Sequence, residues 1–209
     1  MPVQSVIFDF GGVLCGFPGD HNWAAFAAEV GLPADQFLKT FWQDRLSYDR
    51  GDLDDQAYWK PFGELTGKAH TPEQIEKFVE LDCQLWMTFD EPMLEWNRTL
   101  RAAGIKTAVL SNMPQCLGAY LRKHTTLFDE FDVVTLSYEV RSAKPEPHIY
   151  ESCLQGLGVQ ASDALFLDDK EPNVIGAHAL GIQSLVYTNR SDLASQKLSL
   201  GLPPVPLDA

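Results

Sequence analysis

Basic residues are scarce in this chain of 209 residues. Lys and Arg number 16 against 29 Asp and Glu, so the formal net charge at pH 7 is -13. Because a field of this sign repels nucleic acid and anionic membrane surfaces, we expect neither as a partner. It also repels an anionic small substrate unless a local cation or metal inverts the potential at the binding site. A lysine or a metal-binding cluster in such a chain is therefore evidence for a site that binds an anionic substrate.

Long apolar runs and close pairs of cysteines are lacking as well. No apolar run approaches the ~20 residues that cross a bilayer. The first predicted strand begins within a few residues of the start of the chain, so we expect no signal peptide. Cys15, Cys83, Cys116 and Cys153 lack the spacing of metal ligands. We interpret them as free thiols in a reducing compartment and predict a cytoplasmic location.

Hydrophobic residues are not lacking: they make up 45% of the chain, beside 22% charged residues. This composition is ordinary for a globular protein. The length of 209 residues leaves open one domain with an insertion or two separate domains.

The first apolar segment is short and ends in an acid. Val6, Ile7 and Phe8 lead into Asp9, and two glycines follow closely. A short apolar run bounded in this way is typical of a buried parallel strand. The Asp9 carboxylate would then lie at the C-terminal edge of the sheet, where open α/β sheets bind their ligands.

Residues 15–90 show almost no strand-like alternation and predict an all-helical insertion. Apolar residues recur at helical spacing before Gly31, in residues 37–42 and in residues 58–65. We expect the third of these helices to be interrupted or started by Pro61.

A fourth helix of the insertion has a clear start signal. Thr71 can cap it, Pro72 suits the first turn, and Gln74 completes a capping box. The aromatic residues of all four helices fit a hydrophobic core better than a cofactor site.

From residue 91 onward, helices alternate with short apolar strands, which is typical of a parallel sheet with crossover helices. The predicted strands are residues 106–110, 132–136, 164–167 and 183–186. The predicted helices are residues 92–103, 114–123, 149–157 and 173–180, with a last short helix capped by Ser191 and Asp192.

The fold class follows from this order. We predict an α/β protein with a Rossmann-like three-layer parallel sheet and a small all-helical cap inserted after the first strand. The core domain is placed at residues 1–14 and 91–200, and the cap domain at residues 15–90. The proline-rich tail, residues 201–209, is expected to be extended and poorly ordered.

Polar groups follow several of the predicted strands. They are Asp9, Ser111, Asn112, Lys144, Asp168 and Asp169. Because the C-terminal edges of parallel strands lie on one side of a sheet, carboxylates, a hydroxyl and a cation should meet there, as metal-assisted phosphoryl transfer requires. Hard oxygen ligands of this kind favour Mg²⁺.

Four segments give the chain its resemblance to the haloacid dehalogenase-like (HAD) hydrolase superfamily. They are DFGGVL at residues 9–14, LSN at 110–112, KPE at 144–146 and FLDD at 166–169. The resemblance covers the whole chain except the proline-rich tail.

The helical insertion lies between the first two segments. This position is similar to that of the small cap in the subfamily that includes sugar-phosphate phosphatases and the N-terminal phosphatase domain of soluble epoxide hydrolase. Residues 50–54 also resemble a cap sequence of that group.

The resemblance implies nucleophilic catalysis by Asp9, whose carboxylate attacks phosphorus to give an aspartyl-phosphate that water hydrolyses. It implies a metal held by Asp9, the backbone carbonyl of Gly11 and Asp169, with Asp168 beside these ligands or sharing the ligation. It further implies that the Ser111 hydroxyl and the Asn112 backbone N–H bind phosphate oxygens.

Lys144 completes the implied set. It would neutralise both the phosphate and Asp9, which makes it a catalytic and a substrate-binding residue. The implied substrate is a small phosphorylated molecule, and the oligomeric state is left open.

Gly11 departs from the superfamily pattern, because most of its phosphatases carry a second Asp there as general acid and base. Losing a positioned acid or base typically costs ~10² to 10⁴-fold in rate. Solvent or another group would have to transfer the proton, and His21, at the entrance to the cap, is one candidate.

Three functions remain open at this point. The first is an Mg²⁺-dependent phosphatase acting on a small phosphorylated metabolite. The second is a metal-free 2-haloacid dehalogenase, which also lacks the second Asp, although paired Asp168 and Asp169 suit a metal better. The third is a non-catalytic protein that binds a phosphorylated ligand or a partner protein.

Overall fold

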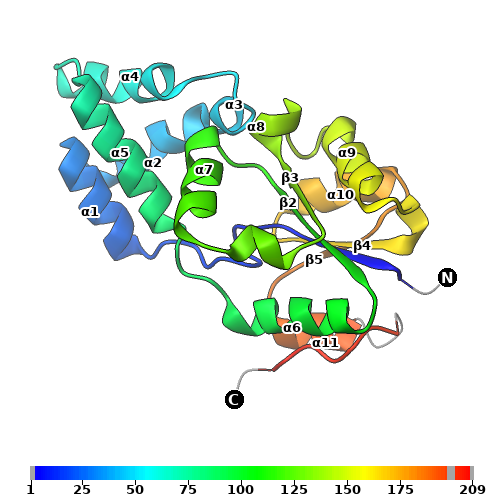
Figure 1. Cartoon of the computed structure of the whole chain (residues 1–209). Helices are drawn as coiled ribbons and strands as arrows, with labels where there is room; N and C mark the ends of the chain where they lie inside the picture. The colour runs from blue at the N-terminus through cyan, green and yellow to red at the C-terminus, as the bar shows by residue number, and fades with distance from the viewer. Residues whose placement is uncertain (1–2, 197–200, 208–209) are drawn as a thin grey trace.

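A five-stranded parallel sheet forms the centre of the computed structural model, which describes residues 3–196 and 201–207 (Figure 1). The strands are β1 (Ser5–Phe8), β2 (Lys106–Ser111), β3 (Val133–Leu136), β4 (Ala164–Asp168) and β5 (Gln183–Val186). Their order in the sheet is β3-β2-β1-β4-β5, and β1 pairs in parallel with β2 on one side and with β4 on the other. All five predicted strands are confirmed, and the apolar run before Asp9 is the central one.

Helices cover both faces of this sheet, which gives the predicted three layers (Figure 1). They are α6 (Glu91–Ala102), α7 (Gln115–His124), α8 (Ser137–Val140), α9 (Pro147–Leu157), α10 (Glu171–Ala179) and α11 (Arg190–Gln196), with two short 3-10 helices at Leu127–Glu130 and Ala161–Asp163. The pleat of β1 sends Phe8 into a cluster with Trp96 of α6, while Ile7 packs on the other side with Ile149 of α9.

Six helices, α1–α6, are inserted between β1 and β2. The first five are α1 (Asp20–Val30), α2 (Ala34–Gln43), α3 (Arg45–Asp49), α4 (Asp55–Thr66) and α5 (Pro72–Leu85). In Figure 1 these five form the helical cap beside the sheet, whereas α6 lies against the sheet.

The cap has an aromatic core of its own. Phe26, Phe37, Phe41, Trp59 and Phe62 are each at most 3% exposed. Neighbouring rings in this group have centroids 4.7 to 6.5 Å apart. The interpretation of these aromatics as core is confirmed.

Two local predictions for the helices need correction, and one helix was not predicted. Helix α4 begins after Asp54, which accepts a hydrogen bond from the Ala57 N–H, and it runs through Pro61 rather than breaking there. Helix α3 was not predicted, because five residues are too short to show a helical period. The cap of α11 is Asn189, whose side chain accepts from the Asp192 N–H.

The described part of the tail, residues 201–207, contains no helix or strand, but the expectation that it is poorly ordered did not include its contacts with the core. Val205 is buried in the core, and the carbonyl of Pro203 accepts a hydrogen bond from Trp96 Nε1 at 3.1 Å. Residues 1–2, 197–200 and 208–209, at the ends of the predicted core domain and tail, lie outside the described residues. None of the helices in residues 3–196 and 201–207 combines the length and apolarity that a membrane crossing requires.

Candidate active site

The predicted polar residues meet at the C-terminal edge of the sheet. Asp9 follows β1, Ser111 ends β2, and Asp168 ends β4. A cavity of about 210 Å³ at this edge is lined by Asp9, Gly11, Ser111, Asn112 and Lys144, together with residues of the cap. The expected gathering of these groups from distant parts of the chain is therefore what the structure shows.

Lys144 is the cation at the centre of this cluster, and it is only 2% exposed. Its Nζ lies 2.8 Å from Asp9 Oδ1 and 2.6 Å from Asp168 Oδ2, and it donates to the Leu110 carbonyl at 2.9 Å. Burial lowers the pKa of Lys144, but the two carboxylates outweigh burial and raise its pKa above the ordinary value. Lys144 is therefore a buried cation that balances the charge of two carboxylates, and it also lines the cavity.

Asp9 is 6% exposed, and burial raises its pKa to about 7 in the absence of a metal. Lys144 opposes this rise, while the charge of Asp168 adds to it. The backbone N–H of Phe10 donates to Asp9 Oδ1 at 2.7 Å and helps fix the carboxylate. A further positive charge beside Asp9 would favour its ionised form.

The two acids after β4 have different surroundings. Both oxygens of Asp168 accept hydrogen bonds, Oδ1 from the Lys170 N–H and Oδ2 from Lys144, while the Asn173 amide donates to each at 3.0 Å. Asp169 Oδ1, in contrast, is buried without a hydrogen-bond partner.

A magnesium ion fits this donor set. Asp9, Asp168 and Asp169 each offer one oxygen, and these three atoms lie within 4.8 Å of one another. Hard oxygen ligands are those that Mg²⁺ prefers. The oxygen of Asp169 that has no hydrogen-bond partner fits this role, because a bound cation would supply the partner that buried polar atoms usually have.

Asn112 has a role that sequence reasoning missed. Its side-chain Nδ2 donates to the Lys144 carbonyl at 2.9 Å, and its Oδ1 accepts from the Lys144 backbone N–H at 2.8 Å. This two-way contact ties the loop that carries Lys144 to the end of β2. Ser111 is 3% exposed and contributes to the cavity lining beside it.

Gly12 is required by both conformation and space. Its φ is +80°, and a Cβ there would lie 2.8 Å from Asp169 Cγ and 2.9 Å from Phe17 Cε2. The loop after β1 can therefore pass close to Asp169 because position 12 carries no side chain.

The cap contributes an ion-pair cluster that the sequence analysis did not find. Arg45 Nε lies 2.7 Å from Asp49 Oδ1, and Arg45 Nη1 lies 2.8 Å from Asp82 Oδ2. Arg45 and Asp49 line the cavity. Burial raises the pKa of Asp49, although Arg45 opposes the rise. The spacing of Arg45 and Asp49, four residues apart, was an available signal, whereas the contact with Asp82 depends on tertiary packing.

His21 does not serve the site. It is exposed and lines a separate surface hollow with Glu29 and Gln84. The candidacy of His21 as the proton-transfer group at this cavity is therefore wrong.

A comparison of the sequence with known protein families agrees with this fold. Residues 3–181 match the family described as haloacid dehalogenase-like hydrolase. The chain belongs to this hydrolase family. The matched residues include all four segments that carry the resemblance, which is thus confirmed.

Curated relatives include phosphatases and a larger protein. Phosphatase MT3486 of Mycobacterium tuberculosis is 28% identical, over 88% of this chain and 87% of the relative. Acyl-CoA dehydrogenase family member 10 of Mus musculus is 31% identical over 96% of this chain, which spans only 19% of that mouse protein.

A solved structure shares the fold. It is a HAD family enzyme of Bacteroides thetaiotaomicron in complex with magnesium and inorganic phosphate. The match has a TM-score of 0.73 at 23% identity and covers 91% of this chain and 98% of the other.

Proposed function

We propose that this hydrolase is an Mg²⁺-dependent phosphatase that acts on a small phosphorylated metabolite through an aspartyl-phosphate on Asp9. The observation that carries the proposal is the cluster of Asp9, Asp168 and Asp169 around one buried lysine, with an oxygen of Asp169 left without a partner. The phosphatase relative and the magnesium and phosphate complex of the Bacteroides enzyme support it.

The metal would be held by Asp9, the backbone carbonyl of Gly11 and Asp169. Asp168 would stay outside this set, because its oxygens already accept from Lys144, Lys170 and Asn173. When bound, Mg²⁺ would supply positive charge against the carboxylates and the phosphate oxygens.

The residues of the chain would carry out the remaining work. Asp9 attacks phosphorus as the nucleophile, and water then hydrolyses the aspartyl-phosphate. The Ser111 hydroxyl, the Asn112 backbone N–H and Lys144 bind and neutralise the phosphate oxygens. Since Lys144 is held by three acceptors before substrate arrives, its charge is already positioned for the transferring group.

The cap would exclude water and select the substrate. We place the cap at residues 15–90 and the core at residues 1–14 and 91–200. Contacts between the two parts reach the catalytic loops: the Ser137 hydroxyl donates to the Asp49 carbonyl, and Arg50 pairs with Glu146, two residues after Lys144.

A screen of phosphate monoesters with and without Mg²⁺ tests this function. We expect turnover that depends on Mg²⁺ and is removed by a chelator. Chloride release from a 2-haloacid without Mg²⁺ would instead support the dehalogenase, for which the missing side chain at Gly11 is the favouring observation. Saturable binding of phosphate esters without any turnover would support the non-catalytic alternative.

A further inference from the structure

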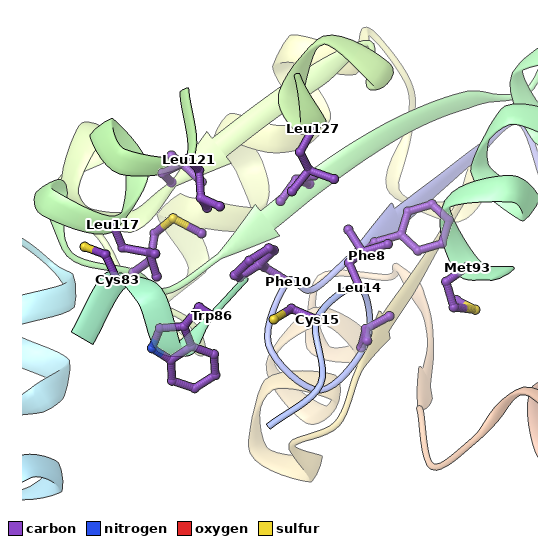
Figure 2. Close-up of a cluster of buried hydrophobic side chains, with 14 of the residues drawn as sticks. Phe8, Phe10, Leu14, Cys15, Cys83, Trp86, Met93, Leu117, Leu121 and Leu127 are labelled. Atoms are coloured by element: carbon purple, nitrogen blue, oxygen red, sulfur yellow. The ribbon is translucent and has the colours of Figure 1, made fainter. Parts of the chain in front are cut away.

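The indole of Trp86 lies beside Gly11, within van der Waals contact of the position that a Cβ would take. A Cβ on Gly11 would lie 3.4 Å from Trp86 Cζ3 and 3.9 Å from Trp86 Cε3. Trp86 follows the end of α5, is 6% exposed, and is held by a hydrogen bond from its Nε1 to Asp82 Oδ1 at 3.2 Å. Figure 2 shows Trp86 with the buried side chains of the loop that follows β1. An aromatic side chain therefore lines the site beside Gly11, which lies two residues after the proposed nucleophile Asp9.

Besides Asp9, the ionisable residues that line the cavity are Arg45, Asp49, Lys144 and the exposed Lys170. Asp49 accepts from Arg45 Nε, and Lys144 lies between Asp9 and Asp168. Arg45 keeps its charge at any ordinary pH. Within the described residues, the cavity thus offers no uncommitted carboxylic acid or histidine to protonate a leaving group.

The mouth of the same cavity is apolar. Phe17, Trp42 and Leu46 line it and are 52%, 44% and 48% exposed. Phe17 also packs against Trp86, with ring centroids 6.0 Å apart. Large exposed apolar side chains gathered at one cavity mark a surface that binds an apolar group.

These two features concern the same part of a substrate, the group that leaves phosphorus. Resting on the proposed phosphatase function, we propose that the substrate is a phosphate monoester or acyl phosphate whose leaving group is apolar and departs as a stabilised anion. Phenols, with a pKa of ~10, and carboxylic acids, with a pKa of ~4, meet this condition. Alcohols with a pKa near that of water, ~16, do not.

The chemical step balances without an acid from the protein. A carboxylate oxygen of Asp9 forms a bond to phosphorus while the bond from phosphorus to the leaving oxygen breaks. The electron pair of that bond stays on the leaving oxygen. A phenolate that departs in this way takes a proton from solvent, whereas a carboxylate stays ionised. Water then attacks phosphorus, the bond to Asp9 breaks, and inorganic phosphate and the Asp9 carboxylate are regenerated.

The test compares esters of similar size but different leaving-group pKa. Phenyl, benzyl and benzoyl phosphate are assayed with the full chain and Mg²⁺, and kcat/KM is taken because it reports the step that forms the aspartyl-phosphate. Since a positioned acid typically contributes ~10² to 10⁴-fold, we expect phenyl and benzoyl phosphate to exceed benzyl phosphate by at least ~10²-fold. Values for benzyl and phenyl phosphate within a few fold would overturn the proposal. The phenyl and benzoyl arms distinguish an aryl ester from an acyl phosphate as the better substrate.

Variants identify the cause of the preference. The double variant G11D/W86A supplies a carboxyl group and the space for it, and we expect it to raise benzyl phosphate turnover relative to phenyl phosphate, whereas W86A alone should not. Asp49→Asn and Lys170→Met should leave the ratio of phenyl to benzyl kcat/KM unchanged. A selective loss of benzyl phosphate turnover in either variant would reveal a proton donor and overturn the proposal.

The apolar contact has a matched pair of variants. Leu46→Gln should lower kcat/KM for phenyl phosphate by ~10-fold but hardly affect acetyl phosphate, whose only apolar group is a methyl. Leu65→Gln changes another exposed leucine of the cap, 45% exposed and outside this cavity, and should affect neither. Equal effects of L46Q on both substrates would contradict the apolar subsite.

Absence of turnover for every ester would overturn the phosphatase function itself, whereas turnover without leaving-group dependence would overturn this inference alone.

Discussion

Replacing Lys144 with Met removes the buried cation that pairs with Asp9 and Asp168 and should destabilise the protein strongly. Lys144 Nζ lies 2.8 Å from Asp9 Oδ1 and 2.6 Å from Asp168 Oδ2, and both acids are buried. Removing one partner of a buried ion pair costs ~3–5 kcal/mol, because the remaining charge is left uncompensated. We expect a loss of this size in the free energy of unfolding of Lys144→Met at pH 8 without Mg²⁺.

The loss should depend on pH with a definite sign. In the wild type, burial pushes the pKa of Asp168 up, but Lys144, together with the hydrogen bonds from the Lys170 N–H and Asn173, outweighs burial and the net pKa is lowered. Without Lys144, burial dominates and the folded-state pKa rises above the unfolded value of ~3.9. Stability of the variant then falls as pH rises through that raised pKa. At pH 5, protonation relieves the repulsion between the Asp9 and Asp168 carboxylates. The loss of unfolding free energy in Lys144→Met should therefore be smaller there than at pH 8, by ~1 kcal/mol or more.

Urea unfolding at pH 5 and pH 8, with and without Mg²⁺, measures these differences. Mg²⁺ should recover part of the stability at pH 8, because an ion that binds only the folded state stabilises it by mass action. Lys170→Met, which removes an exposed lysine that also lines the cavity, is the matched control and should cost under ~1 kcal/mol. A loss in K144M below ~1 kcal/mol, or one that grows toward low pH, would refute the reasoning.

Three further changes test other parts of the structure. Arg45→Met leaves Asp49 and Asp82 unpaired in the cap and should cost ~3–5 kcal/mol in urea unfolding, and a loss under ~1 kcal/mol would show that these pairs are not buried as described. Gly12→Ala, at a φ of +80° and against Asp169, should lower stability by ~1–3 kcal/mol and weaken Mg²⁺ binding measured by calorimetry; unchanged values for both would contradict the close approach. Thr71→Ala breaks the capping box of α5 and should cost ~1 kcal/mol of stability in thermal unfolding. A neutral result would mean that this capping box contributes nothing to the stability of the protein.

Local signals in the sequence were sufficient for much of this fold. The capping box at Thr71 and Gln74 is present as predicted, because its two hydrogen bonds join residues three positions apart. The strand before Asp9 was predicted correctly because a short apolar run with a terminal acid has few other interpretations. The meeting of the site residues could then be predicted, because the C-terminal ends of parallel strands lie at one edge of the sheet.

Features that depend on packing between distant segments escaped prediction. The contact of Arg45 with Asp82 spans 37 residues, and that of Asn112 with Lys144 spans 32. The proline-rich tail looked unstructured by composition, yet Val205 is buried against the core. Trp86 was not singled out in the sequence, because its contact with Gly11 depends on the packing of the end of α5 against the loop after β1.

The central claim is that Asp9 is the nucleophile of a metal-dependent phosphatase, and turnover by Asp9→Asn tests it most directly. The variant and the wild type are compared on phenyl phosphate in Mg²⁺, after thermal unfolding has shown that both are folded. Removing a catalytic nucleophile costs up to ~10⁶-fold in kcat, so we expect turnover at least ~10³-fold below the wild type. Asp9→Asn turning over phenyl phosphate at the wild-type rate would contradict the account.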